Sequence, residues 1–510
     1  MTAGRFARRC GVRFAKLATW QLTAGAAVVG LALAAGSVAA AGPWDSGQRT
    51  AERDRAAALE DGGGADHGNP ASRKDAADGT GGTDARARKT PAAAPSAPSV
   101  LAALGASTGS AQVPEEHALA KLLDPLLDSG SLGPQRTAAV VDAATGKQLY
   151  GKAAGQALTP ASTTKIATAV AVLTAAGPDH RITTRAVIEP GSAKDAKVVL
   201  VGGGDPTLTA RKDAKGNASL RTLADDTARA LKAKGVDEIS LGYDTSLYSG
   251  PLVHPIGLNS NIAPVSALMT DEGRLDDSAS GPAPRSGDPA ADAARTFANL
   301  LRDRGIKTET TDPSSAKATD RAEQLAAVQS PTLSALVERM LTNSDNDIAE
   351  ALSRQAALAT DEPASFDGGA KAIGKQLKKL KLPLTGAQFA DGSGLNRADR
   401  LSASLLTALL ARAADPDHPE LRPVLTGLPV AGFTGTLRNR YADAADALGT
   451  GLVRAKTGTL TGVNTLAGTV ADTDGRLLVF AFMTTGTTDP QTAQSTLDRA
   501  ASALAGCGCS

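Results

Sequence analysis

The sequence divides near residue 114 into a part that cannot bury a core and a part that can. Residues 45–113 are rich in Gly, Ala, Pro and charges of both signs, and they contain almost no large apolar side chains. Such a segment cannot bury enough apolar surface to offset the conformational entropy that folding costs. We therefore expect a disordered linker here, either a tether that gives an enzyme reach or a dispensable insert, and we expect the fold to begin near Glu115.

The N-terminal segment has the pattern of an export signal. Arg and Lys are concentrated in the first 16 residues, and no charged residue occurs from 17 to 44. A basic start followed by an apolar run is typical of a signal peptide, and this run is also long enough to span a bilayer. We expect 1–44 to be a signal peptide or a membrane anchor. The rest of the chain is then exported to the cell envelope and meets the membrane only through this segment.

Composition limits the classes of function. A net charge of +1 over 510 residues argues against a nucleic-acid binder. The five histidines are scattered singly, so we expect no metal site, and we find no cofactor motif. The glycines of "VGGGDPTL" lack the Gly-Lys-Ser/Thr of a phosphate loop and are interpreted as a tight strand exit. Cys507 and Cys509 lie near the C-terminus, where an exposed tail and a strained bridge are both open.

Apolar patterns predict alternating helices and strands beyond residue 114. We expect strands within 137–152 and a hairpin within 462–486 around Asp474-Gly475. Helices are expected in the following segments: 115–127, the run after Pro160, both sides of a polar break at 343–346, 401–414 and 492–506. The order predicts an α/β (α+β) fold in which an antiparallel sheet packs on helices and a separate lobe is inserted.

Ser162 and Lys165 stand three residues apart at the start of an apolar helix, in "PASTTKIATAVAVL". Residues i and i+3 share one helix face. A serine hydroxyl is a weak nucleophile without an adjacent base, and lysine can be that base where burial or a second cation lowers its pKa. A helix start also directs backbone N–H groups at a developing oxyanion. The spacing therefore predicts a nucleophile and its base.

Ser344-Asp345-Asn346 lies in the polar break between two predicted helices. The Ser344 hydroxyl could relay a proton to a leaving amine, and the Asn346 amide could hold a substrate backbone. A helix cap would explain the same residues.

Lys456-Thr457-Gly458-Thr459 directly precedes the predicted hairpin. Gly458 would let a substrate lie along the strand edge, and the lysine and threonines could bind a terminal carboxylate. Lys456 could also be the second cation that lowers the pKa of Lys165. A strand start would again explain the motif alone. The order Ser-x-x-Lys, Ser-x-Asn, Lys-Thr-Gly, however, is the signature of the penicillin-recognising serine enzymes.

The segment from about 115 to 506 resembles the D-alanyl-D-alanine carboxypeptidase/endopeptidases, which are class C low-molecular-mass penicillin-binding proteins of the penicillin-binding protein 4 type. The matching stretches are "PASTTKI", "VGGGDPTL", "NIAPVSALMTDEGRL", "NSDNDIAE", "DGSGLNR", "GTLRNR" and "RAKTGTLTGVNTLAG". The resemblance implies a transpeptidase/β-lactamase-like fold with an antiparallel sheet between helical layers. It also implies a catalytic domain of 114–182 and 326–510, interrupted by inserted subdomains at 183–325.

The resemblance further implies a mechanism. Ser162 would attack the bond between the last two D-alanines of a peptidoglycan stem peptide, D-alanine would leave, and water would hydrolyse the acyl-enzyme. Some relatives also cut cross-links, and β-lactams acylate the same serine. Lys165 would be the base, Ser344 the proton relay and Asn346 the positioner of substrate and lysine. Backbone N–H groups of Ser162 and Thr459 would form the oxyanion hole.

Three other readings compete with this one. A β-lactamase shares the three motifs, but the Glu-x-x-Leu-Asn loop of the common type is not found after Ser344-Asp345-Asn346. A non-catalytic cell-wall-binding protein could have kept the fold. A Ser-His-Asp hydrolase is suggested by "DGSGL", although Asp391 stands where the first glycine of its nucleophile turn belongs and no histidine is nearby in the sequence.

Overall fold

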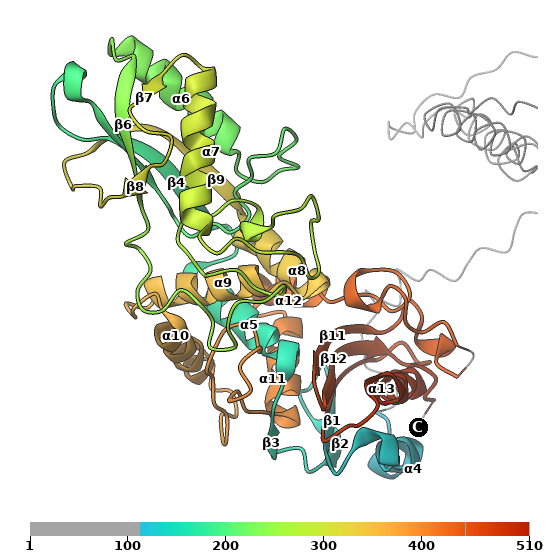
Figure 1. Cartoon of the computed structure of the whole chain (residues 1–510). Coiled ribbons are helices and arrows are strands. Elements are labelled where there is room, and N and C mark those ends of the chain that lie inside the picture. Colours follow the sequence, from blue (N-terminus) through green and yellow to red (C-terminus); the bar gives the residue numbers. More distant parts are fainter. Residues whose placement is uncertain (1–112, 444, 509–510) are drawn as a thin grey trace, which may run out of the picture. The chain divides into compact units, whose positions relative to one another are not determined.

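The computed structural model describes residues 113–443 and 445–508 (Figure 1). The predicted signal or anchor at 1–44, and the predicted linker up to residue 112, lie outside the described residues. Within the described part, no helix is both long and apolar enough to cross a membrane.

A five-stranded antiparallel sheet joins the two ends of the described chain. Its strands are β1 (Gln135–Asp142), β2 (Gln148–Lys152), β11 (Arg454–Leu460), β12 (Val463–Ala471) and β13 (Leu477–Thr485). Their order is β11-β12-β13-β1-β2, so the first strand of the chain pairs with the last. The predicted strands and the hairpin are confirmed. Strand β11, which carries the Lys-Thr-Gly motif, lies at one edge of the sheet.

Helices cover both faces of this sheet because its side chains alternate along each strand. Phe480 and Phe482 of β13 pack in a core with α4 (Glu116–Leu127) and α13 (Pro490–Ala505). Their neighbours Val479 and Ala481 pack in a second core on the opposite face, against the central helices. The predicted antiparallel sheet between helical layers is confirmed.

The second core is built around one fully surrounded helix, α5 (Thr164–Ala176). Every residue from 164 to 173 is buried, because five other α-helices contact α5. These helices are α8 (Leu333–Asn343), α9 (Asn346–Leu358), α10 (Phe366–Lys379), α11 (Ala403–Ala414) and the short α12 (Arg422–Thr426). A helix that is apolar all round needs such an environment. The catalytic-motif residues at its start are therefore held by a rigid, dry scaffold.

Shorter elements complete this part of the chain. Strand β3 (Ala157–Leu158) pairs with β10 (Leu401–Ser402). The remaining short helices are η1 (Gly130–Leu132), η2 (Ala161–Thr163), η3 (Ala193–Asp195), η4 (Asp271–Gly273), η5 (Pro419–Leu421), η6 (Gly435–Leu437) and η7 (Ala447–Gly449).

A second sheet is formed entirely by the segment between α5 and α8. Its strands are β4 (Arg181–Ile188), β5 (Lys197–Val201), β6 (Glu238–Asp244), β7 (Lys307–Thr308), β8 (Ser314–Ser315) and β9 (Glu323–Thr332). Helices α6 (Leu220–Ala233) and α7 (Pro289–Asp303) share its core. Strands β5 and β6 are parallel, which requires the crossover that α6 supplies. Figure 1 shows this sheet and its two helices in colours that run from teal (β4) through green to yellow.

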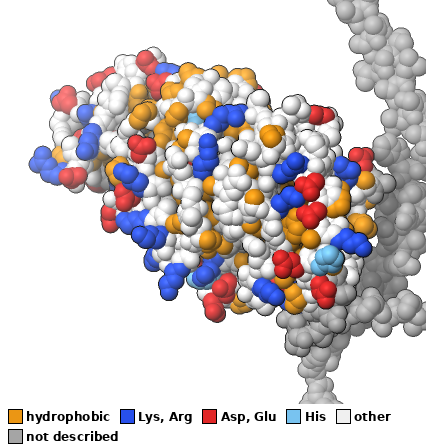
Figure 2. Space-filling view, turned by 90° about the horizontal axis from the view of Figure 1, so that it is seen from below, with side chains coloured by type: hydrophobic (Ala, Val, Ile, Leu, Met, Phe, Trp, Pro, Cys, Tyr) orange, Lys and Arg blue, Asp and Glu red, His pale blue; other side chains and the backbone are white. Residues whose placement is uncertain are grey.

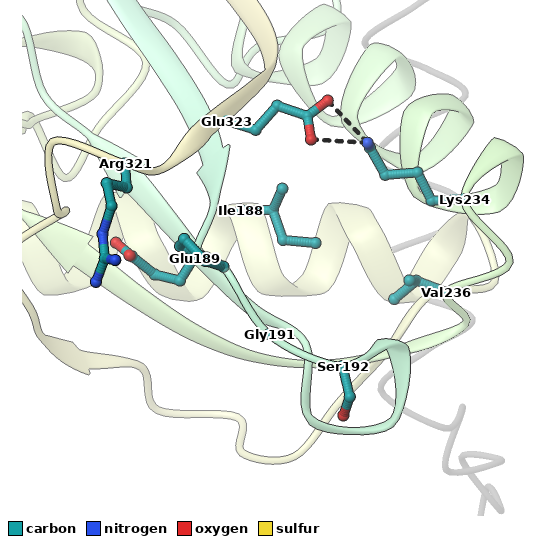
Figure 3. Close-up of a pocket in the computed structure, with 9 residues that line it drawn as sticks. Ile188, Glu189, Gly191, Ser192, Lys234, Val236, Arg321 and Glu323 are labelled. Atoms are coloured by element: carbon teal, nitrogen blue, oxygen red, sulfur yellow. Dashed lines mark hydrogen bonds and ion pairs between the residues drawn. The ribbon is translucent and has the colours of Figure 1, made fainter.

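One cavity opens at the rim of this second sheet (Figure 3). Its volume is about 410 Å³, and Lys234 and Glu323 form an ion pair of 2.8 Å across one side of it. All of its lining residues lie in the inserted segment, so it is separate from the predicted catalytic residues.

Cys507 does not lie in an exposed tail, which was one of the two possibilities that the sequence left open. Its side chain is buried, it is bonded in a disulfide, and its carbonyl accepts a hydrogen bond of 2.9 Å from the Thr473 hydroxyl. The partner of the disulfide lies outside the described residues.

The glycines of "VGGGDPTL" follow β5 and bring it against neighbouring backbone, as a tight strand exit requires. A Cβ at Gly203 would lie 2.0 Å from the Thr183 carbonyl oxygen of β4, a distance that only glycine allows. We predict that Gly203→Ala lowers the free energy of unfolding by about 2 kcal/mol or more, because backbone must move to admit the methyl group. Thermal unfolding of the full chain measures this.

The matched control is Gly287→Ala in the same segment. A Cβ at Gly287 would have no heavy atom within 4 Å, and the residue has no left-handed φ. Its expected change is within about 0.5 kcal/mol. Equal melting temperatures for the two variants would contradict the close approach of Gly203 to Thr183 of β4.

Candidate active site

The structure brings the three predicted motifs together where α5 begins. Ser162 lies in η2 and Lys165 in the first turn of α5, while Ser344 ends α8 and Asn346 begins α9. Lys456 reaches them from the edge strand β11. Segments that are far apart in the sequence thus meet within hydrogen-bonding distance.

Lys165 is the centre of this arrangement. Its Nζ donates to Ser162 Oγ at 3.1 Å, to Asn346 Oδ1 at 2.6 Å and to the Ser393 carbonyl at 2.7 Å. The side chain is fully buried, and burial lowers its pKa to about 8 because the charged form loses its hydration. Carboxylates around it oppose this shift: Asp391, Asp345, Glu350 and Asp399. A neutral amine at this distance can accept the Ser162 proton.

The turn that carries Ser162 is fixed through the Pro160 carbonyl. This oxygen accepts from the Thr163 hydroxyl at 2.7 Å and from the Thr465 hydroxyl of β12 at 2.9 Å. Ala161, which lies between Pro160 and Ser162 in the chain, has a φ of 49°, an uncommon conformation for a residue other than glycine. The hydroxyl of Ser162 is partly exposed, so it can meet a ligand.

Ser344-Asp345-Asn346 is both a helix junction and part of the site. Ser344 ends α8 in the left-handed region at φ 58°, and Asp345 caps α9 by accepting from the Ile348 N–H at 3.0 Å. Ser344 Oγ accepts from Lys456 Nζ at 2.8 Å. Because its oxygen accepts this hydrogen bond, the hydroxyl proton of Ser344 is left to donate elsewhere.

Lys456 is fully buried, and its pKa lies well below the usual range because of burial and because of the Lys165 charge. Burial is the main cause of the lowered pKa at Lys165, and the repulsion between the two lysines is seen as a lower pKa at Lys456. Because like charges disfavour each other, this repulsion favours the loss of one proton from the pair, and the expectation that Lys456 lowers the pKa of Lys165 stays a prediction.

Packing requires a glycine at position 458, for a reason that the sequence did not suggest. A Cβ there would lie 2.7 Å from the Pro160 carbonyl oxygen and 2.1 Å from Thr465 Oγ1. Glycine therefore lets β11 pack against the turn of Ser162. In the same strand, Thr457 Oγ1 hydrogen-bonds Thr436 Oγ1 at 2.9 Å, and Thr459 is exposed at the free sheet edge.

The third partner of Lys165, the Ser393 carbonyl, was not predicted: "DGSGL" was considered as a nucleophile turn and as part of the family resemblance, but not as a contact of the lysine. Glu350 Oε1 accepts from the Gly392 and Ser393 N–H groups at 3.1 and 2.9 Å, which holds this loop in place. A Cβ at Gly394 would lie 1.9 Å from the Ala161 carbonyl oxygen. The Gly-Ser-Gly spacing signals a tight turn, but nothing in it names the lysine that the turn contacts.

The structure also brings a histidine to this loop, although none is near in sequence. His254 Nε2 lies 2.9 Å from Asp391 Oδ2, and Ser393 Oγ donates to the same carboxylate at 3.2 Å. In a Ser-His-Asp triad the histidine must contact the serine. Here the carboxylate stands between them and Ser393 is fully buried, so the three residues are not arranged as a triad.

Two buried carboxyl groups, Asp391 and Asp399, form a hydrogen-bonded pair near the lysine. Burial acts to raise the pKa of Asp391, but hydrogen bonds from His254, Asp399 and the Gly394 N–H bring it to about 2. Burial and the neighbouring Asp391 charge raise the pKa of Asp399 to about 9. At neutral pH, Asp399 is therefore the protonated partner and Asp391 the ionised one.

Two buried groups have enough ligand atoms close together to hold a metal ion: His254, Glu350 and Asp391, and also Glu272, Asp345 and Asp347. Arginines already balance both groups. Arg354 lies 3.3 Å from Glu350, and Arg285 lies 2.8 Å from Asp347. A cation would have to displace these guanidinium groups, so both clusters fit internal ion pairing better than metal binding.

Comparison with known proteins gives the family. The model of the D-Ala-D-Ala carboxypeptidase 3 (S13) family matches residues 119–284 and 279–504. Carboxypeptidase Rv3627c of Mycobacterium tuberculosis is 37% identical over 431 residues, 82% of this chain and 91% of that protein. Carboxypeptidase DacB of Mycolicibacterium smegmatis is 36% identical over 414 residues, 78% of this chain and 86% of that protein.

The fold has a solved counterpart as well. The crystal structure of penicillin binding protein 4 (dacB) from Haemophilus influenzae matches with a TM-score of 0.60 at 20% identity, and it covers 76% of this chain and 98% of that one. The predicted penicillin-recognising fold is confirmed. With a family match that spans most of the described residues, the chain belongs to the D-Ala-D-Ala carboxypeptidase (S13) family.

Proposed function

We propose that this chain is a serine carboxypeptidase that removes the terminal D-alanine from peptidoglycan stem peptides through an acyl-enzyme on Ser162. One observation carries the residue assignment: the buried Lys165 Nζ lies between Ser162 Oγ and Asn346 Oδ1. Membership of the family supports the substrate class and the reaction.

In the proposed acylation, the neutral Lys165 amine takes the Ser162 proton as Oγ attacks the carbonyl carbon of the penultimate D-alanine. Backbone N–H groups of Ser162 and Thr459 stabilise the oxyanion. The Ser344 hydroxyl gives its proton to the amine of the leaving D-alanine and is replenished from Lys165 or Lys456. Water, activated by Lys165, then hydrolyses the ester and restores Ser162.

The substrate would lie along β11. The start of this edge strand pairs with residues 429–431, and beyond Ala455 no described strand pairs with its outer side, so an extended peptide can add there as a further strand. Lys456, Thr457 and Thr459 would face the terminal carboxylate, with Gly458 keeping the strand close to Ser162. An arriving carboxylate favours the protonated form of Lys456, which offsets the effect of burial on its pKa.

The remaining assignments follow from this function. We propose that 114–182 and 326–510 form the catalytic domain and that 183–325 form the inserted lobe, which is supported by the separate core of the second sheet. We also propose that β-lactams acylate Ser162, that cross-links are a further substrate, and that the enzyme acts in the cell envelope. Residues 1–44 would serve as export signal or anchor.

Release of D-alanine from a peptide ending in D-Ala-D-Ala tests the activity with the full chain. We expect Ser162→Ala to lower the rate by at least about a thousandfold, because no other group can form the acyl-enzyme. Ser314→Ala is the matched control: Ser314 and Lys317 form a second Ser-x-x-Lys in the inserted segment, and Ser314 is exposed. Release that survives Ser162→Ala would contradict the assignment, and a folded parent without activity would favour the wall-binding protein.

The pKa of Lys165 predicts a pH dependence. Because the neutral amine is the base, the acylation rate by benzylpenicillin should rise with pH and level off above a pKa of about 8. Below that pH it should fall about tenfold per unit. Stopped-flow rates across this range measure the profile. A rate that is flat or that falls as the pH rises towards 8 would contradict Lys165 as the base.

A further inference from the structure

Residues 261–285 of the inserted lobe, called the inserted segment below, contain the groups that contact the Ser344-Asp345-Asn346 motif and the residue after it. The side-chain Nδ2 of Asn346 donates to the Asn261 carbonyl at 3.0 Å. Two residues further along this segment, the Ala263 N–H donates to Asp347 Oδ1 at 2.9 Å. Arg285, near the end of the segment, places Nη1 2.8 Å from Asp347 Oδ2. The first turn of α9 therefore contacts the inserted segment as well as Lys165 of α5.

These contacts determine which way the Asn346 carboxamide faces. Its Oδ1 accepts from Lys165 and its Nδ2 donates to the Asn261 carbonyl. A flipped amide would oppose the lysine with two N–H donors and the carbonyl with an oxygen, so both hydrogen bonds would become repulsive. The carbonyl of Asn261 thus helps to keep an acceptor against the Lys165 amine.

The segment is fixed by a buried cluster of opposite charges. Glu272 is buried and lies between Arg274, at 2.8 Å, and Arg339 of α8. The Glu272 carbonyl accepts from Arg285 Nη1 at 2.6 Å. The chain turns here through Asp271 and Glu272 at φ values of 50° and 60°, which L-residues adopt only where surrounding contacts hold them. This cluster therefore connects the inserted lobe to α8 and α9.

Asp347 connects this cluster to the site residue Asn346. It follows Asn346 in the chain, it is buried, and it contacts the inserted segment at both Ala263 and Arg285. Within the described residues its carboxylate forms no hydrogen bond with Ser162 or Lys165, so its effect must pass through Asn346.

We propose that Asp347 is a positioning residue for acylation: it holds the inserted segment so that the Asn261 carbonyl orients the Asn346 carboxamide towards Lys165. The inference rests on the proposed function, since it takes Ser162, Lys165 and Asn346 as the acylating group. The inserted lobe then contributes directly to the rate of the chemical step.

Acylation of the full chain by benzylpenicillin, followed by stopped-flow at several concentrations, separates the non-covalent Kd from the acylation rate constant. We expect Asp347→Asn and Arg285→Met to lower the rate constant by about ten- to a hundredfold, because a small misplacement of a catalytic group costs this much. The Kd should change by less than about threefold, since the substrate-binding strand is untouched. Arg285→Lys keeps the charge and should recover most of the rate.

The matched control is Arg304→Ala. Arg304 pairs with Asp225 at 2.6 Å between α7 and α6 of the same lobe and has no contact with the Ser-Asp-Asn motif. It should lower the melting temperature and leave the rate constant unchanged. The final amount of adduct counts the folded, active molecules of each variant, so partial unfolding does not mimic a slower reaction.

The outcomes distinguish the two levels of the account. Unchanged rate constants in Asp347→Asn and Arg285→Met, with lower melting temperatures, would overturn the positioning role and leave the pair purely structural. Equal losses in Arg285→Lys and Arg285→Met would also count against it. A parent protein that forms no adduct would instead overturn the proposed function, and the inference with it.

Discussion

The site depends on a lysine that is kept out of water. Burial of a lysine is costly unless its donors are satisfied, and Lys165 is satisfied by a hydroxyl, an amide oxygen and a backbone carbonyl from three separate segments. The same burial makes the neutral amine accessible near physiological pH. Packing of α5 against its neighbours therefore supplies both the position and the basicity of this group.

The surroundings of Lys165 explain several otherwise separate features. Glycines at 394 and 458 let the Ser393 loop and β11 approach the turn of Ser162. Glu350 holds that loop and pairs with Arg354, whose guanidinium lies 4.2 Å from the centre of the Phe366 ring. A buried ion pair of this kind adds little net stability but specifies one arrangement of its neighbours. Figure 2 shows Lys, Arg, Asp and Glu side chains spread over one face of the molecule, and ion pairs that are exposed in this way contribute little to stability.

Local signals made much of the site predictable. Ser162 and Lys165 are three residues apart where η2 leads into α5, so the i, i+3 spacing was enough to predict their contact. Ser344, Asn346 and Lys456 were predicted because their motifs keep a fixed order, and the sheet was predicted from turn signals and from the order of helices and strands. The Asp474-Gly475 turn gave the hairpin directly.

The features that were not predicted depend on contacts between distant segments. The Ser393 and Asn261 acceptors are backbone carbonyls, which every residue has, so no residue type marks them. His254 looked isolated because its partner, Asp391, is far away in the chain. The parallel pairing of β5 and β6 and the burial of Cys507 likewise follow from tertiary packing.

Mass spectrometry of the full chain with benzylpenicillin, with peptide mapping of the adduct, tests the central claim most directly. The account predicts one lasting penicilloyl group on the peptide that contains Ser162, and much slower labelling in Lys165→Arg. An adduct on Ser344 or Ser393, or undiminished labelling of Ser162 in Lys165→Arg, would contradict it. A Ser162 adduct that disappears while penicillin is consumed would instead identify a β-lactamase.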